Sequence, residues 1–415
     1  MYWRLRGPDM KIIFTIAWRN IWRHPARSGV LLMAVAVGLW AGVFAVGTTN
    51  GLMQQRIDYV IESELTHLQI HHPQFRAEGD SAKYIPDYEE IVSRLNEDKR
   101  VKSFTLRTIT DGMLQSPVKT SGVRIRGIDV ESETRTTVFH ENIVEGEYLD
   151  TDIPNAVIMG KNLAEEHNMR PGNRIVLTFE DTDNELVSAA FNIAGFFDSG
   201  ATEYDKRNVF VVSDELIDLL SDRPVYHEIA VMLHDQEYAA EVAADLNSAF
   251  AGIESLTWRQ LSPELSTLVE LGGFVLFIIT LVIMTALAFG ILNTMLMALF
   301  ERLREIGMLL SIGMSRLRVF MMILLESVIL TISGAFAGLF MAWISISYYN
   351  TRGINLEMFA SGLAEVGWDH IIYPFLDPGQ YFTIMLIVAG VTMLASIYPA
   401  VKAVRVNPLE AAKNI

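Results

Sequence analysis

The sequence predicts an α-helical membrane protein with four transmembrane helices and one large exterior α+β domain. Four runs without Asp, Glu, Lys or Arg occupy residues 28–55, 271–300, 327–351 and 378–401. A long polar segment, residues 53–267, lies between the first two runs. Hydrophobic residues make up 51% of the 415-residue chain and charged residues 20%, which is typical of a membrane protein with a sizeable soluble part.

Each uncharged run is long enough to cross a bilayer, which takes about 20 apolar residues at a rise of about 1.5 Å per residue. We expect transmembrane helices at residues 28–55, 268–300, 319–349 and 380–401. The first run is too long for the apolar part of a signal peptide and no cleavage site follows it, so it is interpreted as a retained anchor. The absence of cysteine excludes disulfides, thiolate metal sites and thiol nucleophiles.

The charge distribution predicts the orientation. Residues 53–267 carry 19 Lys and Arg against 39 Asp and Glu, and the loop at 350–379 has Arg352 against four acids. Both ends of the chain and the loop at 301–318 are basic instead. Because basic flanks remain cytoplasmic, we expect both termini and the 301–318 loop inside, and residues 56–265 and the 350–379 loop outside.

The two cytoplasmic ends receive separate predictions. Residues 1–27 are expected to hold an amphipathic helix at the inner membrane surface, preceding the first crossing, and residues 402–415 a short tail. One apolar stripe of that helix is formed by Phe14, Trp18, Ile21 and Trp22.

The exterior segment combines strand and helix patterns. Helices are predicted at residues 87–96, where Asp87 and Glu90 form a capping-box pattern, and at 235–250. Alternating hydrophobicity predicts strands at residues 66–72, 123–128, 175–179 and 209–212.

Similar strands follow the two helices, at residues 101–107 and 253–259, with Ser, Thr and Arg at matching offsets. This similarity predicts two β-α-β halves that close one domain from both ends of the segment. The stretch of roughly 120–220 then becomes a β-rich insertion between the halves.

Motifs for catalysis are absent. Gly160-Lys161 is the only Gly-Lys pair, and Asn155 and Asn162 stand where a phosphate-binding loop requires Gly and Ser or Thr. His67, His71 and His72 are interpreted as exposed histidines rather than a metal site, because a site needs more ligands. We therefore expect no catalytic residue, no metal, no cofactor in this chain and no nucleic-acid partner.

The cytoplasmic segment 301–315 predicts a short amphipathic helix. Leu303, Ile306 and Leu310 recur at helical spacing and are expected to lie in a groove of another protein, although a membrane-surface turn also fits. The residues expected to contact such a partner are Glu301, Arg302, Arg304, Glu305, Ile306, Gly307, Leu309, Leu310 and Gly313.

The same segment carries a specific resemblance. Glu301-Arg-x-Arg-Glu-Ile-Gly-x-Leu-x-Ser-Ile-Gly-x-Ser315, together with Ala17–Arg23 and Tyr398–Ala411, resembles the FtsX-like family of ABC transporter permeases, which includes MacB and the LolC/LolE lipoprotein-releasing permeases. Residues 159–164 and 194–205 look like the periplasmic domain of that family, and the Gly-x-x-Glu-Tyr-Asp element within the latter is most similar to the lipoprotein-releasing branch.

The resemblance implies a function and its partners. Two permeases, identical or related, would assemble in the bacterial inner membrane with two separate ATPase subunits that bind ATP and Mg²⁺, the 301–315 helix being the coupling element. Mechanotransmission would then extract lipoproteins from the outer leaflet toward a periplasmic chaperone or adaptor. Efflux of periplasmic peptides or small molecules, and signalling to a periplasmic enzyme, remain as alternatives.

Three residues of the third predicted transmembrane helix, residues 319–349, are candidates for transmission. Glu326 is the only ionisable residue within that hydrophobic stretch, so it is expected either to return to the interface or to pair with Arg302 or Arg304. Gly334 and Gly338 are expected to allow close packing against a neighbouring helix.

An apolar cavity for acyl chains is the last prediction. Its candidate lining residues could equally serve in helix packing or face lipid. They are Trp40, Phe44 and Thr48 on the first helix, with Phe274 and Phe277 on the second.

Overall fold

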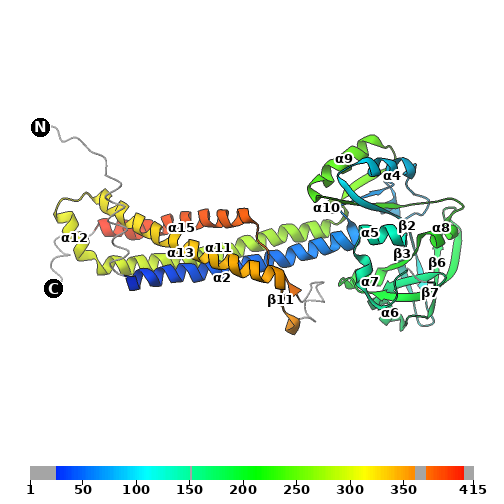
Figure 1. Cartoon of the computed structure of the whole chain (residues 1–415), viewed down its shortest axis with the longest axis horizontal. Coiled ribbons are helices and arrows are strands. Elements are labelled where there is room, and N and C mark those ends of the chain that lie inside the picture. Colours follow the sequence, from blue (N-terminus) through cyan, green and yellow to red (C-terminus); the bar gives the residue numbers. More distant parts are fainter. Residues whose placement is uncertain (1–24, 150–151, 360–370, 406–415) are drawn as a thin grey trace. The chain divides into compact units, whose positions relative to one another are not determined.

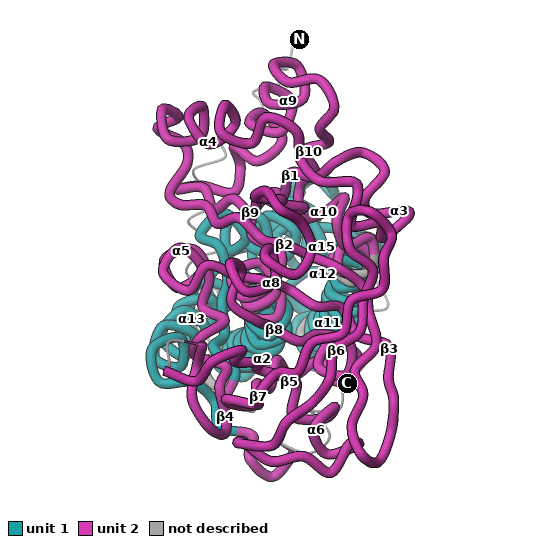
Figure 2. Tube along the Cα trace, turned by 90° about the vertical axis from the view of Figure 1, so that its right-hand side faces the viewer, with its two compact units in different colours: residues 1–53, 270–355, 372–415 teal, residues 54–269, 356–371 magenta. Residues whose placement is uncertain are grey.

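The computed structural model describes residues 25–149, 152–359 and 371–405. It divides into two compact units, coloured separately in Figure 2. The described part of the first unit comprises residues up to 53, 270–355 and 372–405, and we call it the helical unit. The second contains residues 54–269 and 356–371 and is the exterior domain. Most of the predicted N-terminal amphipathic helix and of the C-terminal tail lies outside the described residues.

Four helices of the described chain are long and apolar enough to cross a membrane, which confirms the predicted number. They run alongside one another in Figure 1, and the short helix α12 (Leu303–Ser311) connects two of them. Their bounds are α2 (Pro25–Val60), α11 (Pro263–Glu301), α13 (Arg316–Arg352) and α15 (Pro378–Val404). The last begins at a capping box formed by Asp377 and Gln380, with Pro378 in its first turn.

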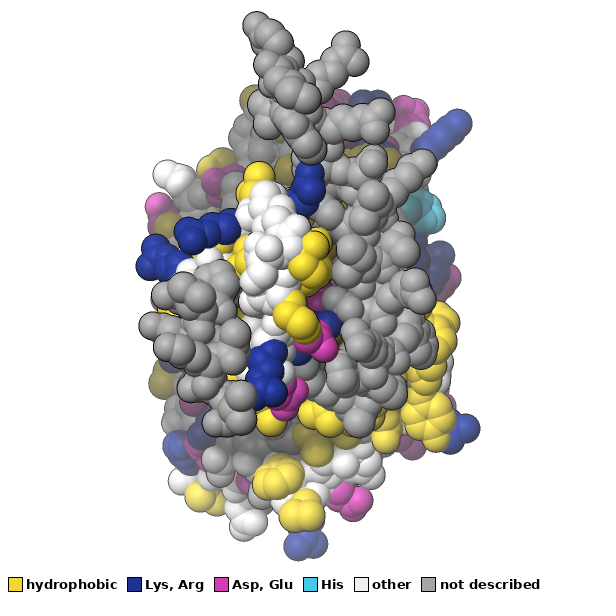
Figure 3. Space-filling view, turned by 90° about the vertical axis from the view of Figure 1, so that its left-hand side faces the viewer, with side chains coloured by type: hydrophobic (Ala, Val, Ile, Leu, Met, Phe, Trp, Pro, Cys, Tyr) yellow, Lys and Arg dark blue, Asp and Glu magenta, His cyan; other side chains and the backbone are white. Residues whose placement is uncertain are grey.

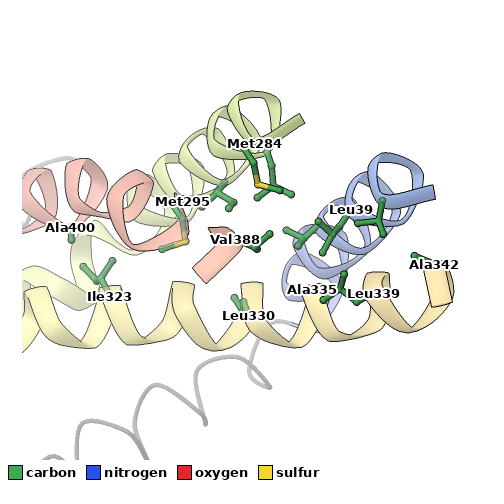
Figure 4. Close-up of a cluster of buried hydrophobic side chains, with 14 of the residues drawn as sticks. Leu39, Met284, Met295, Ile323, Leu330, Ala335, Leu339, Ala342, Val388 and Ala400 are labelled. Carbon is green, nitrogen blue, oxygen red and sulfur yellow. The ribbon is translucent and has the colours of Figure 1, made fainter. Parts of the chain in front are cut away.

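Buried aliphatic side chains from all four helices meet in one core (Figure 4). Leu39 of α2, Met284 of α11, Leu330 of α13 and Val388 of α15 are among its members. Because such residues recur every third or fourth position, each helix presents one face to this core.

The exterior domain contains the two predicted β-α-β halves. The first is β1 (Leu68–His71), α4 (Tyr88–Glu97) and β2 (Val101–Gln115), and the second is β9 (Glu228–Leu233), α9 (Ala239–Ala249) and β10 (Glu254–Thr257). Their strands interleave in the order β10-β1-β9-β2, and β1 is antiparallel to both neighbours. The prediction of two halves closing one domain is confirmed.

The insertion between the halves adds strands to the same sheet. The order continues from β2 through β3, β8, β5 and β7 to β4, with β6 pairing with β2 and β7. The bounds of these strands are β3 (Thr120–Ile128), β4 (Ile143–Gly146), β5 (Ala156–Gly160), β6 (Arg174–Glu180), β7 (Leu186–Phe197) and β8 (Asn208–Val212). All four strands predicted from alternation are present.

Short helices complete the exterior domain. They are η1 (Ile61–Leu65), α3 (Phe75–Glu78), α5 (Val130–Thr136), η2 (Phe139–Asn142), α6 (Lys161–His167), α7 (Thr202–Arg207), α8 (Ser213–Leu220), η3 (Gln236–Tyr238), α10 (Trp258–Leu261) and η4 (Glu357–Phe359). A two-stranded pair joins β11 (Ile354–Asn355) to β12 (Ile371–Ile372).

Strand β2 belongs to both lobes of the exterior domain. Its first half, residues 101–107, pairs with β9 of the β-α-β core, and its second half, residues 107–115, pairs with β3 of the insertion. The insertion therefore has no separate sheet of its own, since it extends one strand of the core.

Two local predictions are wrong. Asp87 adopts a left-handed conformation (φ 46°) and makes no side-chain cap bond, so the predicted capping box does not form. The prediction of exposed histidines is also wrong. His71 is buried, with a ring nitrogen 3.1 Å from the carbonyl oxygen of His227, and Nδ1 of His67 accepts a hydrogen bond from the amide of Leu233. Sheet pairing places these side chains among backbone groups, and no cluster of three or more metal-ligating side chains occurs within the described residues.

Candidate functional site

Helix α12 turns its apolar edge toward its own unit. Ile306 is 5% exposed, and Leu303 and Leu310 pack against the four-helix core. The expectation that this edge lies in a groove of another protein is therefore wrong. Periodicity identifies an apolar face, but the inner ends of the long helices also need cover, and this face supplies it.

The opposite side of α12 remains exposed. Met308 is 59% and Ile312 is 84% exposed, and both project from the surface together with Arg304. Figure 3 shows hydrophobic, basic and acidic side chains next to one another on the face of the molecule that carries α12. A mixed surface of this kind suits a protein partner, because apolar anchors are surrounded by charges.

The remaining residues of the predicted segment shape the turn. Gly307 is buried within α12, while Leu309 is half-buried and Glu301 is exposed. Gly313 has φ +97°, a conformation that L side chains rarely adopt, at the turn that reverses the chain before α13. The helix is thereby held in a fixed position between α11 and α13.

Arg302 connects this turn to α13. Its Nη1 donates to both carboxylate oxygens of Glu326, at 2.9 and 3.0 Å, and its Nε donates to Glu305 at 3.2 Å. Glu326 is only 7% exposed. The predicted pairing of Glu326 with a cation of the cytoplasmic segment is confirmed, and removing one partner would leave a buried charge without compensation.

Gly334 and Gly338 pack α13 against α2. A Cβ at Gly338 would lie 2.6 Å from the carbonyl oxygen of Ala36, and one at Gly334 would lie 3.0 Å from that of Leu32. The predicted close approach is confirmed, because only glycine leaves room for this backbone contact. Glu326 thus lies on a helix that packs closely against α2.

An apolar cavity of about 530 Å³ lies between α2 and α11. Only alanine, glycine, valine, isoleucine and leucine line it. The lining residues are Ala34, Val35, Gly38, Ala41, Gly42 and Ala45 of α2, with Ile279, Ile283, Ala286, Leu287, Gly290 and Ile291 of α11.

The five residues proposed from sequence to line a cavity lie elsewhere. Trp40 donates from Nε1 to the hydroxyl of Ser345 at 3.0 Å, and Phe44 contacts Tyr349 of the same helix α13. Thr48 donates to the carbonyl oxygen of Phe44. Phe274 and Phe277 of α11 are 61% and 60% exposed. The size of these aromatic side chains suggested a cavity wall, whereas alanine, glycine and aliphatic side chains line the cavity between α2 and α11.

The exterior domain contains a buried ionic cluster that the sequence reasoning missed. Arg107 donates to Glu133 at 2.6 and 3.0 Å, to Glu228 at 2.6 Å and to the carbonyl oxygen of Glu64 at 3.2 Å. We call Arg107, Glu133 and Glu228 the Arg107 cluster. It joins β2 and β9 of the core to α5 of the insertion and to the turn η1, which follows helix α2.

The charges in this cluster stabilise one another. Burial by itself would lower the pKa of Arg107, but the adjacent Glu133 and Glu228 raise it. Burial opposes ionisation of Glu228, yet the positive charges of Arg107 and Arg126 bring the pKa of that carboxyl down to about 2. The only sequence signal was the matching offset of Arg107 and Arg259, and Arg259 instead lies over the ring of Trp258.

Two known domains match the chain. Residues 28–249, more than half of the chain, match the MacB-like periplasmic core domain, and residues 277–408 match the FtsX-like permease C-terminal domain. The two matches cover α2 with most of the exterior domain and the other three long helices.

Individual proteins are similar over long stretches. The lipoprotein-releasing system transmembrane protein LolC of Xylella fastidiosa is 22% identical over 405 residues, which span 92% of each chain. The macrolide export ATP-binding/permease protein MacB of Nitrosomonas europaea is 22% identical over 78% of this chain and 50% of its own length. The crystal structure of the periplasmic region of MacB from Actinobacillus actinomycetemcomitans covers 49% of this chain and 94% of its own, with 14% identity and a TM-score of 0.33.

Proposed function

Since this chain belongs to the family of ABC transporter permeases that carry a MacB-like periplasmic core domain and an FtsX-like permease domain, we propose that it extracts lipoproteins from the outer leaflet of the bacterial inner membrane. Two copies, or this chain with a related permease, assemble with two ATPase subunits on the cytoplasmic side. A periplasmic chaperone or adaptor receives the cargo.

The apolar cavity carries this proposal. It offers no charged or polar side chain to a ligand, so it suits a hydrocarbon ligand. An acyl chain that leaves the bilayer for such a site stays out of water, where exposure of each CH₂ group would cost about 0.8 kcal/mol. The similarity to LolC along 92% of both chains agrees with this cargo, while the similarity to MacB keeps efflux as the second candidate.

The inner ends of the helices supply the coupling. An ATPase would contact the exposed face of α12 at Met308 and Ile312, and its movement would reach α13 through Arg302 and Glu326. Both termini and α12 are then cytoplasmic, as the basic residues around them favour. The exterior domain acts on cargo that never enters the cytoplasm.

The test is release of a triacylated lipoprotein from proteoliposomes that contain this chain and the ATPase that copurifies with it. ATP should transfer the acylated protein to the soluble fraction and leave its non-acylated form unaffected. Release of a small amphipathic compound but not of the lipoprotein would favour efflux. ATP turnover without release of either the lipoprotein or the small compound would favour signalling.

A matched pair of variants connects release to the cavity. Gly38 lines it and nothing lies within 4 Å of a Cβ built there, so Gly38→Leu should narrow the cavity without disturbing the backbone. Gly29 is equally open on the same helix and does not line the cavity, so Gly29→Leu is the control. Gly38→Leu should lose release and retain ATP turnover; equal release by both variants would argue against an acyl-chain site here.

A further inference from the structure

An extended segment, residues 372–377, crosses the outer ends of α2 and α13 within the helical unit. The amide of Phe375 donates to the carbonyl oxygen of Gly47 at 2.9 Å. The side chain of Asn50 donates to the carbonyl oxygen of Phe375 at 3.3 Å, and that of Asn350 to the carbonyl oxygen of Pro374 at 3.1 Å. Backbone polar groups close to a bilayer need such partners, and here the two helices provide them.

Packing fits this segment to α2. A Cβ on Gly51 would overlap the carbonyl oxygen of Tyr373, and its three nearest atoms would all be backbone atoms of the segment. Leu376 is 6% exposed and belongs to the four-helix core. The capping box of Asp377 then fixes the end of the segment to α15. The segment is therefore seated in a groove that glycine creates on α2.

The segment extends a contact that already runs along α2. Ala36 meets Gly338, Trp40 bonds to Ser345, and Gly47 lies against Ile346. At 100° per residue, the α2 positions that face α13 and the segment fall on one side of the helix. The α2 residues Ala34, Gly38, Ala41 and Ala45, which line the cavity, fall on the opposite side.

Helix α11 has fewer buried side chains than α2 along the cavity, and one of its contacts there is Ile283 against Gly42 of α2. Its residues 273–283 include no buried side chain, whereas buried residues return from Met284 onward. This stretch includes Ile279 and Ile283, which line the cavity. A helix segment with few buried contacts is displaced at lower cost than one packed along its whole length.

We propose that residues 372–377 form a strap that fixes the outer end of α2 to α13, so that the cavity between α2 and α11 changes shape by movement of α11 alone. This inference rests on the proposed function, because it assigns the moving wall of the acyl-chain site. The fixed wall is α2, whose cavity face is turned away from the strap.

Cross-linking tests the proposal without any cargo. The native chain has no cysteine, so introduced pairs give no background. Asn50→Cys with Phe375→Cys reports on the strap, and Ala41→Cys with Ala286→Cys reports on the cavity. Each pair is treated with a short bis-maleimide in membranes that hold the complex with its ATPase, without nucleotide and with ATP and vanadate.

The strap pair should react at the same rate in both states, and the rate of the cavity pair should change several-fold. The inference would be overturned if the cross-linking rate of the strap pair depended on nucleotide, or if the rate of the cavity pair did not. Because neither readout uses a lipoprotein, the expected cross-linking pattern without lipoprotein release would refute the proposed cargo and leave the strap intact.

A second arm removes the strap. Gly51→Val should displace residues 372–377, abolish cross-linking of the strap pair, and uncouple ATP turnover from release. Gly29→Val, on the same helix with nothing within 4 Å of its Cβ, should change neither. If Gly51→Val fails to insert, Asn350→Ala removes the remaining side-chain bond instead, because Asn50→Cys of the strap pair has already removed the other. Normal coupling in a variant whose strap pair no longer reacts would contradict the proposal.

Discussion

Substitution of Arg107 by Met tests whether the Arg107 cluster holds the two lobes of the exterior domain together. Methionine fills part of the volume but leaves Glu133 buried without its cation and Glu228 with Arg126 at 3.7 Å, at side-chain exposures of 1% and 4%. Breaking a buried pair in this way costs about 3–5 kcal/mol. Burial raises the pKa of Glu228, but Arg107 together with Arg126 brings it from 4.5 down to about 2, so the cluster favours the ionised carboxyl.

The pH dependence follows from the sign of that shift. Glu228 has a lowered pKa in the folded state, so its contribution is complete above pH 4.5 and is lost as the pH falls toward 2. In Arg107→Met the carboxyls of Glu133 and Glu228 are buried without that cation, so protonation of these carboxyls removes the destabilising buried charge. Because burial without Arg107 disfavours the ionised form of these carboxyls, the stability deficit relative to the native chain should begin to shrink above pH 4.5 and should shrink further below it.

The assay is hydrogen exchange of the full-length chain in nanodiscs at pH 7. Amides of β9 and of the second half of β2 should exchange faster in Arg107→Met by the factor that corresponds to the lost stability. Arg124→Met is the control, because Arg124 pairs with Asp111 on the same sheet at nearly half exposure, where such a pair contributes about 0–1 kcal/mol. Equal exchange in the two variants would refute the role assigned to the cluster.

Three further predictions concern the helical unit. Glu326→Gln should fold and bind the ATPase but lower the ratio of release to ATP turnover, whereas Glu326→Leu should also reduce copurification of the ATPase; unchanged values for both would leave the pair with Arg302 without a role. Met308→Asp with Ile312→Asp should weaken copurification with no change in membrane insertion, and full ATPase recovery would remove α12 from the contact. An impermeant thiol reagent applied from outside should label Ser248→Cys and spare Ser315→Cys; the reverse pattern would invert the topology.

Sequence reasoning predicts the helices well because their signal is local. An uncharged run of sufficient length specifies a crossing wherever its neighbours lie, and a lone carboxyl such as Glu326 within such a run requires a partner. The two β-α-β halves are also visible, since helices 87–96 and 235–250 are each followed by a similar strand.

Contacts between distant residues are not visible in the same way. The amphipathic pattern of Ile306 and its neighbours identifies an apolar edge, but only the folded bundle shows that the edge is covered by the chain itself. Arg107 resembles any charged residue of an alternating strand, because its partners Glu133 and Glu228 lie 26 and 121 positions away. The residues that line the cavity escaped prediction because they are alanine, glycine and aliphatic side chains, which carry no distinctive signal in a transmembrane helix.

The continuity of β2 constrains how this domain can diverge. Side chains alternate between the faces of a strand, so inserting or deleting one residue near Arg107 would turn every later position of β2 to the opposite face. Leu114, which is buried in the core of the insertion, would then point to solvent. Relatives that exchange or enlarge the inserted lobe must therefore do so beyond the end of β2, at its hairpin with β3 or farther along. Strand β2 therefore fixes which face each side chain occupies in both lobes, whereas the lengths of the loops can vary.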